Sequence, residues 1–117
     1  MGKTILIVDD HPSFRASARL MLEASGYQVV GEATDGSSAI DAVRDLQPDV
    51  VLLDVRLPDL DGFQVAERLA ASGTAPAMVL TSSRDRSDFG SDVSASPAHG
   101  FVAKSELSAE AITSLIR

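Results

Sequence analysis

Carboxylates follow two short apolar runs of this sequence, and their spacing indicates a cation site. Asp9 and Asp10 come directly after the run at residues 4–8, and Asp54 follows the run at residues 50–53. An acid at the carboxyl end of a buried parallel strand lies where open α/β sheets place their chemistry. Carboxylates held close together repel one another and need a cation. Oxygen ligands with room for water and phosphate favour Mg²⁺, or Mn²⁺, over zinc.

Two further apolar runs end in groups that complement such a site. The run at residues 77–81 ends in Thr81-Ser82-Ser83, which offers hydroxyls, and the run at residues 100–103 is followed by Lys104. Together with the acids, these groups suit phosphoryl transfer to Asp54. A metal ion and an ammonium neutralise the phosphoryl oxygens, and a hydroxyl donates one hydrogen bond.

Simpler interpretations compete with this one. Asp54 alone could be an ordinary residue at the start of a loop, although three acids on one sheet edge make that explanation weaker. A Mg²⁺-dependent phosphohydrolase with Asp54 as nucleophile usually needs a second acid two residues later, and that position is Arg56. His11 and His99 are isolated, and neither a glycine-rich phosphate loop nor a dinucleotide-binding fingerprint is present.

Alternating strand-like and helical stretches must position these groups. We predict strands at residues 4–8, 28–32, 50–53, 77–81 and 100–103, and helices near residues 12–24, 37–46, 62–72 and 107–117. This alternation predicts an α/β fold, a three-layer sandwich around a five-stranded parallel sheet of order 2-1-3-4-5 with about five helices. In that order the first and third strands are neighbours, which brings their acids together.

The segment between the last two strands is the weak element. Residues 83–99 contain Gly90, Pro97 and five serines, so the intrinsic helix propensity is poor. We predict a fourth helix near residues 85–94 that is short, irregular or mobile.

The third helix, in contrast, has a clear apolar pattern. Its spacing predicts a buried face made of Phe63, Ala66, Leu69 and Ala70.

Composition limits the functional classes. The 117 residues suit a single domain with one core, and the formal net charge of −7 argues against nucleic-acid binding through the chain's own charge. The lack of cysteine excludes disulfides and thiolate metal sites. No apolar run approaches the roughly 20 residues that span a bilayer. We therefore expect a soluble, cytoplasmic domain that does not contact a membrane.

Four segments resemble the receiver domain of two-component response regulators. In chain order they are Ile5-Leu6-Ile7-Val8-Asp9-Asp10-His11-Pro12, Asp49-Val50-Val51-Leu52-Leu53-Asp54, Leu57-Pro58-Asp59-Leu60-Asp61-Gly62 and Gly100-Phe101-Val102-Ala103-Lys104. Each segment alone is a weak signal, but four in this order and at these separations are highly specific. The resemblance covers essentially the whole chain. It implies a flavodoxin-like fold and phosphorylation of Asp54 by the phosphohistidine of a partner histidine kinase.

The resemblance also implies a set of metal ligands. Asp10 and Asp54 would ligate Mg²⁺ directly, together with the backbone carbonyl of Arg56, while Asp9 would act through a water molecule.

A hydroxyl and an aromatic ring take the family's switch positions. Ser82 fits the Ser/Thr position because it lies 22 residues before Lys104, with Thr81 and Ser83 as alternatives. In the family, phosphorylation draws this hydroxyl towards the phosphate, and the aromatic residue, here Phe101, rotates inward. The change is read out on the face made by the fourth helix, the fifth strand and the fifth helix.

Three features depart from the commonest receiver pattern. One is the weak fourth helix. Another is Ser105, which follows Lys104 where many receivers have proline after a cis bond, so we expect a trans bond or a strained cis bond with a shifted loop.

The third departure is a pair of arginines. Arg56 and Arg84 occupy the positions that tune dephosphorylation in receivers. They could pair with Asp59 or Asp85, shield the acyl phosphate from water, or simply be solvated. We hypothesise that they slow autodephosphorylation.

The expected function is signalling rather than enzymatic turnover. We expect residues 1–117 to form a receiver domain, the N-terminal part of a longer regulator, because Asp-Asp-His-Pro and Lys-Ser-Glu-Leu resemble the subgroup with a LuxR-type helix-turn-helix output. Its partners would be a sensor histidine kinase and a second copy of the chain after phosphorylation. DNA would be bound only through an output domain outside these residues, to control transcription. The alternative is a receiver-like interaction module that works without phosphate.

Overall fold

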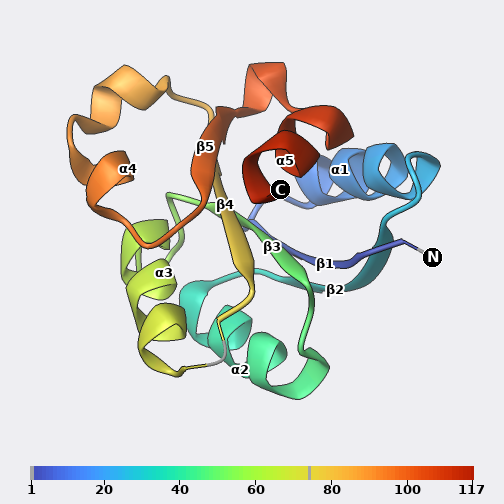
Figure 1. The fold of residues 1–117 in the computed structure, drawn as a ribbon, viewed down its shortest axis with the longest axis horizontal. Coiled ribbons are helices and arrows are strands. Elements are labelled where there is room, and N and C mark those ends of the chain that lie inside the picture. The colour runs from blue at the N-terminus through green and yellow to red at the C-terminus, as the bar shows by residue number, and fades with distance from the viewer. Residues whose placement is uncertain (1, 74) are drawn as a thin grey trace.

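The computed structural model describes residues 2–73 and 75–117, and it confirms the predicted α/β architecture. Five parallel strands pair in the order β2-β1-β3-β4-β5 and occupy Thr4–Val8 (β1), Gln28–Ala33 (β2), Val50–Asp54 (β3), Ala77–Ser82 (β4) and Gly100–Ala103 (β5). The helices are Pro12–Ala24 (α1), Gly36–Leu46 (α2), Gly62–Ala71 (α3), Asp92–Ala95 (α4) and Ala109–Ile116 (α5). Figure 1 shows this flavodoxin-like arrangement, with α1 and α5 on one side of the sheet and α2 and α3 on the other.

Two apolar cores lie on the two faces of the sheet. Successive side chains of a strand point to opposite faces, so a strand covered on both sides reads as a continuous apolar run. In β3, Val51 and Leu53 join the core under α2 and α3, while Val50 and Leu52 join the core under α1 and α5. All four side chains are completely buried, which fixes the register that carries Asp54 to the sheet edge.

The buried face of α3 differs in part from the prediction. Ala66 and Leu69 are buried and Phe63 is partly buried, but Ala70 is exposed and Val65 takes the remaining core position. The prediction of Ala70 was therefore wrong: the buried stripe of α3 is rotated towards Val65.

A close backbone contact fixes where α3 begins. A Cβ atom on Gly62 would lie 2.5 Å from the carbonyl oxygen of Asp54, so only glycine fits there. Asp61 then caps the helix, because its carboxylate accepts a hydrogen bond from the Gln64 amide while Gln64 accepts one from the Asp61 amide.

The fourth helix is short and irregular, as the sequence predicts. A 3-10 turn at Arg86–Phe89 and the four-residue α4 replace a regular helix, and Gly90 between them has a φ of 57°. This φ lies in the left-handed region, which glycine tolerates best.

The connection after β5 also differs slightly from the expected helix at residues 107–117. Lys104–Glu106 forms a 3-10 turn, and α5 begins at Ala109, where the hydroxyl of Ser108 accepts a hydrogen bond from the Ala111 amide. The peptide bond between Lys104 and Ser105 is trans. Within the described residues, none of the helices is long and apolar enough to cross a membrane.

Candidate functional site

The sheet brings the predicted site residues to one edge. In the parallel register, Asp54 pairs with Thr81 and Ser82 pairs with Ala103, which immediately precedes Lys104. Asp9 extends the neighbouring β1 by one more backbone hydrogen bond, from its amide to the carbonyl of Ala33 at 3.0 Å. The carboxyl ends of four strands therefore meet at one place, as expected for an open α/β sheet.

The acids form a tight group at this edge. Asp9 is fully buried and Asp54 is 3% exposed, while Asp10 is exposed. Candidate ligand atoms from these three residues and His11 all lie within 4.8 Å of one another. His11 is therefore not isolated: its Nδ1 lies 2.9 Å from Asp9 Oδ1 and 3.1 Å from Asp10 Oδ1. The adjacent Asp10 was the sequence signal for this contact.

Lys104 is the cation that faces the buried acids. Its Nζ lies 2.6 Å from Asp9 Oδ2 and 3.3 Å from Asp54 Oδ2, and its side chain is 18% exposed. The ammonium also lies 4.3 Å from the ring centroid of Phe14 in α1. A cation over an aromatic face is attracted to it. The sequence contains no local signal for this contact, because 90 residues separate Phe14 from Lys104.

The two buried acids have opposite pKa shifts. Burial, and then the neighbouring Asp9, raise the pKa of Asp54 from 3.8 to about 6. Burial also acts against the ionised form of Asp9, but Lys104 and the His11 amide outweigh it and hold the pKa of Asp9 below its usual value. The charge of Asp9 is thus stabilised while that of Asp54 is disfavoured, as expected when two carboxylates share one ammonium.

The donor atoms fit a hard divalent cation. Two buried carboxylates, Asp9 and Asp54, share the single ammonium of Lys104, so their combined negative charge exceeds the positive charge beside them. Carboxylates held this close favour a bound cation. A site of carboxylate oxygens with an exposed side at Asp10 suits Mg²⁺ or Mn²⁺.

The three candidate hydroxyls differ in their surroundings. Thr81 Oγ1 donates a 2.7 Å hydrogen bond to the carbonyl of Val102, which commits it to holding β4 against β5. Ser83 is exposed. Ser82 is 2% exposed, and its oxygen accepts a hydrogen bond from the Arg84 amide. Of the three, Ser82 has the surroundings that best fit a switch hydroxyl.

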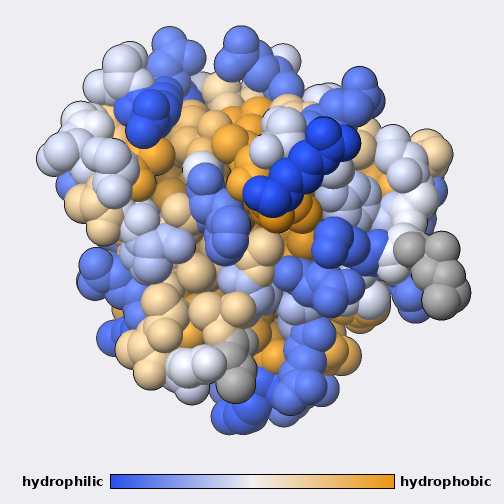
Figure 2. Space-filling view, viewed as in Figure 1, coloured by the Kyte–Doolittle hydropathy of each residue, from blue (hydrophilic) through white to orange (hydrophobic). Residues whose placement is uncertain are grey.

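Phe101 belongs to a row of three aromatic rings. It is partly buried, and its ring centroid lies 5.7 Å from that of Phe89, which lies 5.8 Å from that of Phe63. The row runs from β5 past the irregular segment to α3. Figure 2 shows apolar surface between α4 and α5, around this part of β5.

Arg56 and Arg84 have exposed side chains. The described residues provide no ion pair between either arginine and Asp59 or Asp85. Asp59 instead accepts hydrogen bonds from two backbone amides at the start of α2, at 2.7 and 3.0 Å. The Arg56 amide donates to Asp54 Oδ1 at 3.2 Å, so the backbone of Arg56 lies at the site while its side chain is exposed to solvent.

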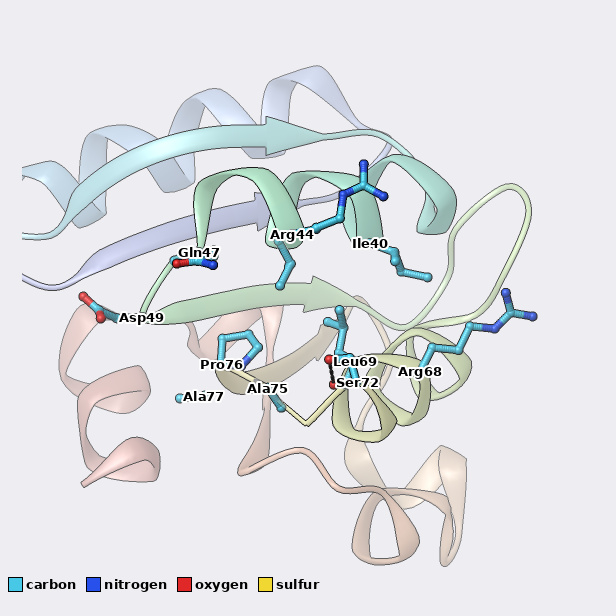
Figure 3. Close-up of a pocket in the computed structure, with 12 residues that line it drawn as sticks. Ile40, Arg44, Gln47, Asp49, Arg68, Leu69, Ser72, Ala75, Pro76 and Ala77 are labelled. Carbon is cyan, nitrogen blue, oxygen red and sulfur yellow. Dashed lines mark hydrogen bonds between the residues drawn. The ribbon is translucent and has the colours of Figure 1, made fainter.

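The described residues also form a cavity away from this site. It has a volume of about 580 Å³ and lies between α2 and α3, beside Asp49 and Ala77 at the amino ends of β3 and β4. Figure 3 shows that the guanidinium groups of Arg44 and Arg68 point away from it. The candidate site therefore does not coincide with this cavity.

Comparisons with known proteins agree with the geometry. The family model described as "Response regulator receiver domain" matches residues 5–117. The transcriptional activator EvgA of Escherichia coli K12 is 34% identical over 101 residues, which are 86% of this chain and 50% of EvgA. The virulence-factor transcription regulator BvgA of Bordetella pertussis is 35% identical over 106 residues, 91% of this chain and 51% of BvgA. The chain thus spans about half the length of the curated relatives it matches.

Solved structures give the same result. The signal receiver domain of the response regulator NarL from Mycobacterium tuberculosis superposes with a TM-score of 0.85 at 33% identity, and covers 98% of this chain and 90% of that one. A LuxR-family two-component response regulator from Aurantimonas has a TM-score of 0.81 at 31% identity, and covers 90% of this chain and 76% of that one.

Proposed function

This chain belongs to the response regulator receiver family, and we propose that it accepts a phosphoryl group on Asp54 from a sensor histidine kinase to control transcription. One observation carries the proposal. Asp54 is almost fully buried at the end of β3, yet it faces the carboxylate of Asp9 and shares the ammonium of Lys104. A buried carboxylate with a raised pKa beside a cation site is costly for folding, and such costs mark functional groups.

In the proposed reaction, an oxygen of Asp54 attacks the phosphorus of a phosphohistidine. The new O–P bond forms as the P–N bond breaks, and the imidazole nitrogen keeps the electron pair of the broken bond. Lys104 neutralises the charge of the phosphoryl oxygens, and the Ser82 hydroxyl donates a hydrogen bond to one of them. Asp10, Asp54 and the Arg56 carbonyl would hold the Mg²⁺ directly, with Asp9 acting through water. The ion would supply further charge neutralisation.

Phosphorylation would then change the surface around β5. Movement of the Ser82 hydroxyl towards the phosphate leaves space that the ring of Phe101 fills, which repacks the row of aromatic rings. The chain is a phosphoacceptor that catalyses its own phosphorylation and dephosphorylation, and it is not an enzyme that turns over a substrate.

Arg56 and Arg84 slow the dephosphorylation of Asp54 by shielding its acyl phosphate from water. Replacing both arginines with alanine should therefore shorten the lifetime of the phosphorylated protein.

The setting of the domain is also part of the proposal. Residues 1–117 would be the N-terminal receiver of a longer cytoplasmic regulator, because the match covers only about half the length of the curated relatives, which are transcription regulators. DNA binding would belong to a LuxR-type output domain outside these residues, since the chain itself has a net charge of −7. The apolar surface near β5 suits a homodimer formed after phosphorylation.

Intact mass after incubation with Mg²⁺ and acetyl phosphate or phosphoramidate tests the proposal. We expect one phosphoryl adduct, lost in Asp54→Asn and retained in Asp49→Asn, which changes an exposed acid at the other end of β3. Continuous phosphate release with no adduct would instead indicate a phosphohydrolase. No adduct and no release would indicate an interaction module that works without phosphate.

A further inference from the structure

One arginine of α1 ties the loop that carries the acid pair to the edge strand β2. Arg15 Nη1 donates a 2.7 Å hydrogen bond to the backbone carbonyl of Asp9, and Arg15 Nε donates a 2.8 Å hydrogen bond to Glu32 in β2. The Arg15 side chain is only 15% exposed. Its planar guanidinium group can satisfy both acceptors at once in a fixed geometry, which a lysine ammonium on a flexible chain does less well.

Glu32 is itself held firmly. Its second carboxylate oxygen accepts a 2.9 Å hydrogen bond from Arg19 Nε, so each oxygen has its own arginine. Partial burial disfavours its charge, but the hydrogen bonds from Arg19 and Arg15 outweigh this and keep the pKa of Glu32 below its usual value. Arg19 shares Glu32 with Arg15, but its other hydrogen bond goes to Glu23 rather than to the acid loop.

Asp9 is held by hydrogen bonds at three points, two on its backbone and one on its side chain. Its amide donates to the carbonyl of Ala33, its carboxylate accepts from the His11 amide at 2.8 Å, and its carbonyl accepts from Arg15. Only Asp9, Asp10 and His11 connect β1 to α1. A shift of the Asp9 carbonyl would therefore move both carboxylates of the loop.

We propose that Arg15 is a positioning residue for the cation site: by holding the Asp9 carbonyl against β2, it keeps the carboxylates of Asp9 and Asp10 in the arrangement that binds Mg²⁺. The inference rests on the proposed function, since the cation is the one that phosphoryl transfer to Asp54 requires. Partners outside the ligand set orient metal ligands in many proteins, and their loss weakens metal binding.

The test compares two charge-conserving variants, Arg15→Lys and its matched control Arg19→Lys. The chain has no Trp, so isothermal titration with MgCl₂ is the suitable measurement of affinity. We expect the Mg²⁺ dissociation constant to rise about tenfold in Arg15→Lys, the lower end of what outer partners contribute, and less than about twofold in Arg19→Lys, which does not touch the acid loop. Because both variants keep the positive charge, altered repulsion of the cation cannot explain a difference.

A second measurement separates positioning from simple stability. In Arg15→Lys, the Mg²⁺ concentration for half-maximal phosphorylation by acetyl phosphate should rise by the same factor as the dissociation constant, with the maximal rate unchanged. Equal dissociation constants in the two variants, or a lower thermal midpoint with unchanged Mg²⁺ affinity, would show that Arg15 only stabilises the fold.

A second variant covers the case in which Arg15→Lys does not fold. Glu32→Gln keeps Arg15 but removes the negative charge that pairs with its guanidinium group. The Mg²⁺ dissociation constant should therefore rise, by a smaller factor than in Arg15→Lys. An unchanged constant would overturn the role of Arg15. A wild-type chain that binds no Mg²⁺ and takes no phosphoryl group would instead overturn the proposed function, whatever the variants do.

Discussion

Two aspartates at the opposite ends of β3 have opposite electrostatic surroundings. Asp49, just before the strand, is exposed and accepts hydrogen bonds from the Thr4 amide and hydroxyl, which lower its pKa. Asp54, at the end of the strand, is buried beside another acid, and its pKa is raised to about 6. The amino end of the strand lies beside a cavity of about 580 Å³ but has only exposed charges, whereas the carboxyl end has buried charges. Buried charge, rather than the presence of a cavity, therefore distinguishes the end of the sheet at which we propose phosphoryl transfer.

The largest expected effect comes from removing the ammonium group of Lys104, which lies at the carboxyl end of β3. In metal-free buffer, Lys104→Met should lower the free energy of unfolding by about 3 kcal/mol, because it leaves Asp9 and Asp54 buried without their shared ammonium. Urea denaturation with a chelator present measures this change. The only other lysine, Lys3, is exposed and supplies the control: Lys3→Met should change the free energy by less than about 0.5 kcal/mol. Equal effects of the two substitutions would contradict the contrast between the two ends.

The second largest expected effect is a difference between Asp54 and Asp49 in how each changes the pH dependence of stability. Asp54 holds its proton more tightly in the folded state, with a pKa of about 6, than in the unfolded state, with a pKa near 3.8. The unfolded state therefore releases protons first as pH rises, and Asp54 makes folding less favourable over this range. Relative to Asp54→Asn, the metal-free wild type should lose about 2 kcal/mol of unfolding free energy between about pH 4 and pH 7.

Asp49 should behave in the opposite way. Its pKa is lowered in the folded state, so its stabilising contribution is present above the unfolded pKa and is lost as pH falls. The stability advantage of wild type over Asp49→Asn should therefore be constant at neutral pH and shrink as pH falls below the unfolded pKa of about 3.8. A stability difference for Asp54→Asn that does not change with pH would mean that Asp54 titrates normally in the fold.

Mg²⁺ bound at the carboxyl end of β3 should raise the free energy of unfolding, by less than the changes expected for Lys104 and Asp54. An ion that binds only the folded state at ten times its dissociation constant adds about 1.4 kcal/mol. Thermal unfolding with MgCl₂ and with chelator measures this gain. Asp10→Asn should abolish it while leaving the metal-free protein nearly unchanged, because Asp10 is exposed. Asp49→Asn should keep the full gain, and its loss there would mean that the cation binds elsewhere.

The fold and most of the site could be predicted because they depend on local patterns. Continuous apolar runs marked strands buried on both faces, and topology alone then placed Asp9, Asp54 and Lys104 at one edge. The poor helix propensity of residues 83–99 correctly indicated the short α4. The buried face of α3 was predicted less well, because Val65 and Ala70 both fit an apolar helical pattern and only packing against the sheet selects Val65.

The contacts that no local pattern contains could not be predicted. The ring of Phe14 lies against Lys104 although 90 residues separate them, and the aromatic row joins α3, the irregular segment and β5. Arg15 reaches Glu32 and the Asp9 carbonyl only because β2 pairs with β1. Such contacts depend on side-chain directions in three dimensions. Of the contacts at the site that the sequence analysis missed, only that of His11 with the acids had a local signal, because His11 directly follows Asp10.

The smallest effects are expected for substitutions beside the cavity at the amino ends of β3 and β4. Arg44 and Arg68 are exposed there, with their guanidinium groups directed away from the hollow, and Arg44 pairs only with exposed acids. Exposed ion pairs contribute little to stability, so the double substitution Arg44→Ala and Arg68→Ala should change the free energy of unfolding by about 0.5 kcal/mol or less. Mg²⁺ affinity and phosphorylation of Asp54 should be unchanged, as measured by titration calorimetry and intact mass. A clear loss of either would mean that the two ends of the sheet are coupled, so that the cavity takes part in the function after all.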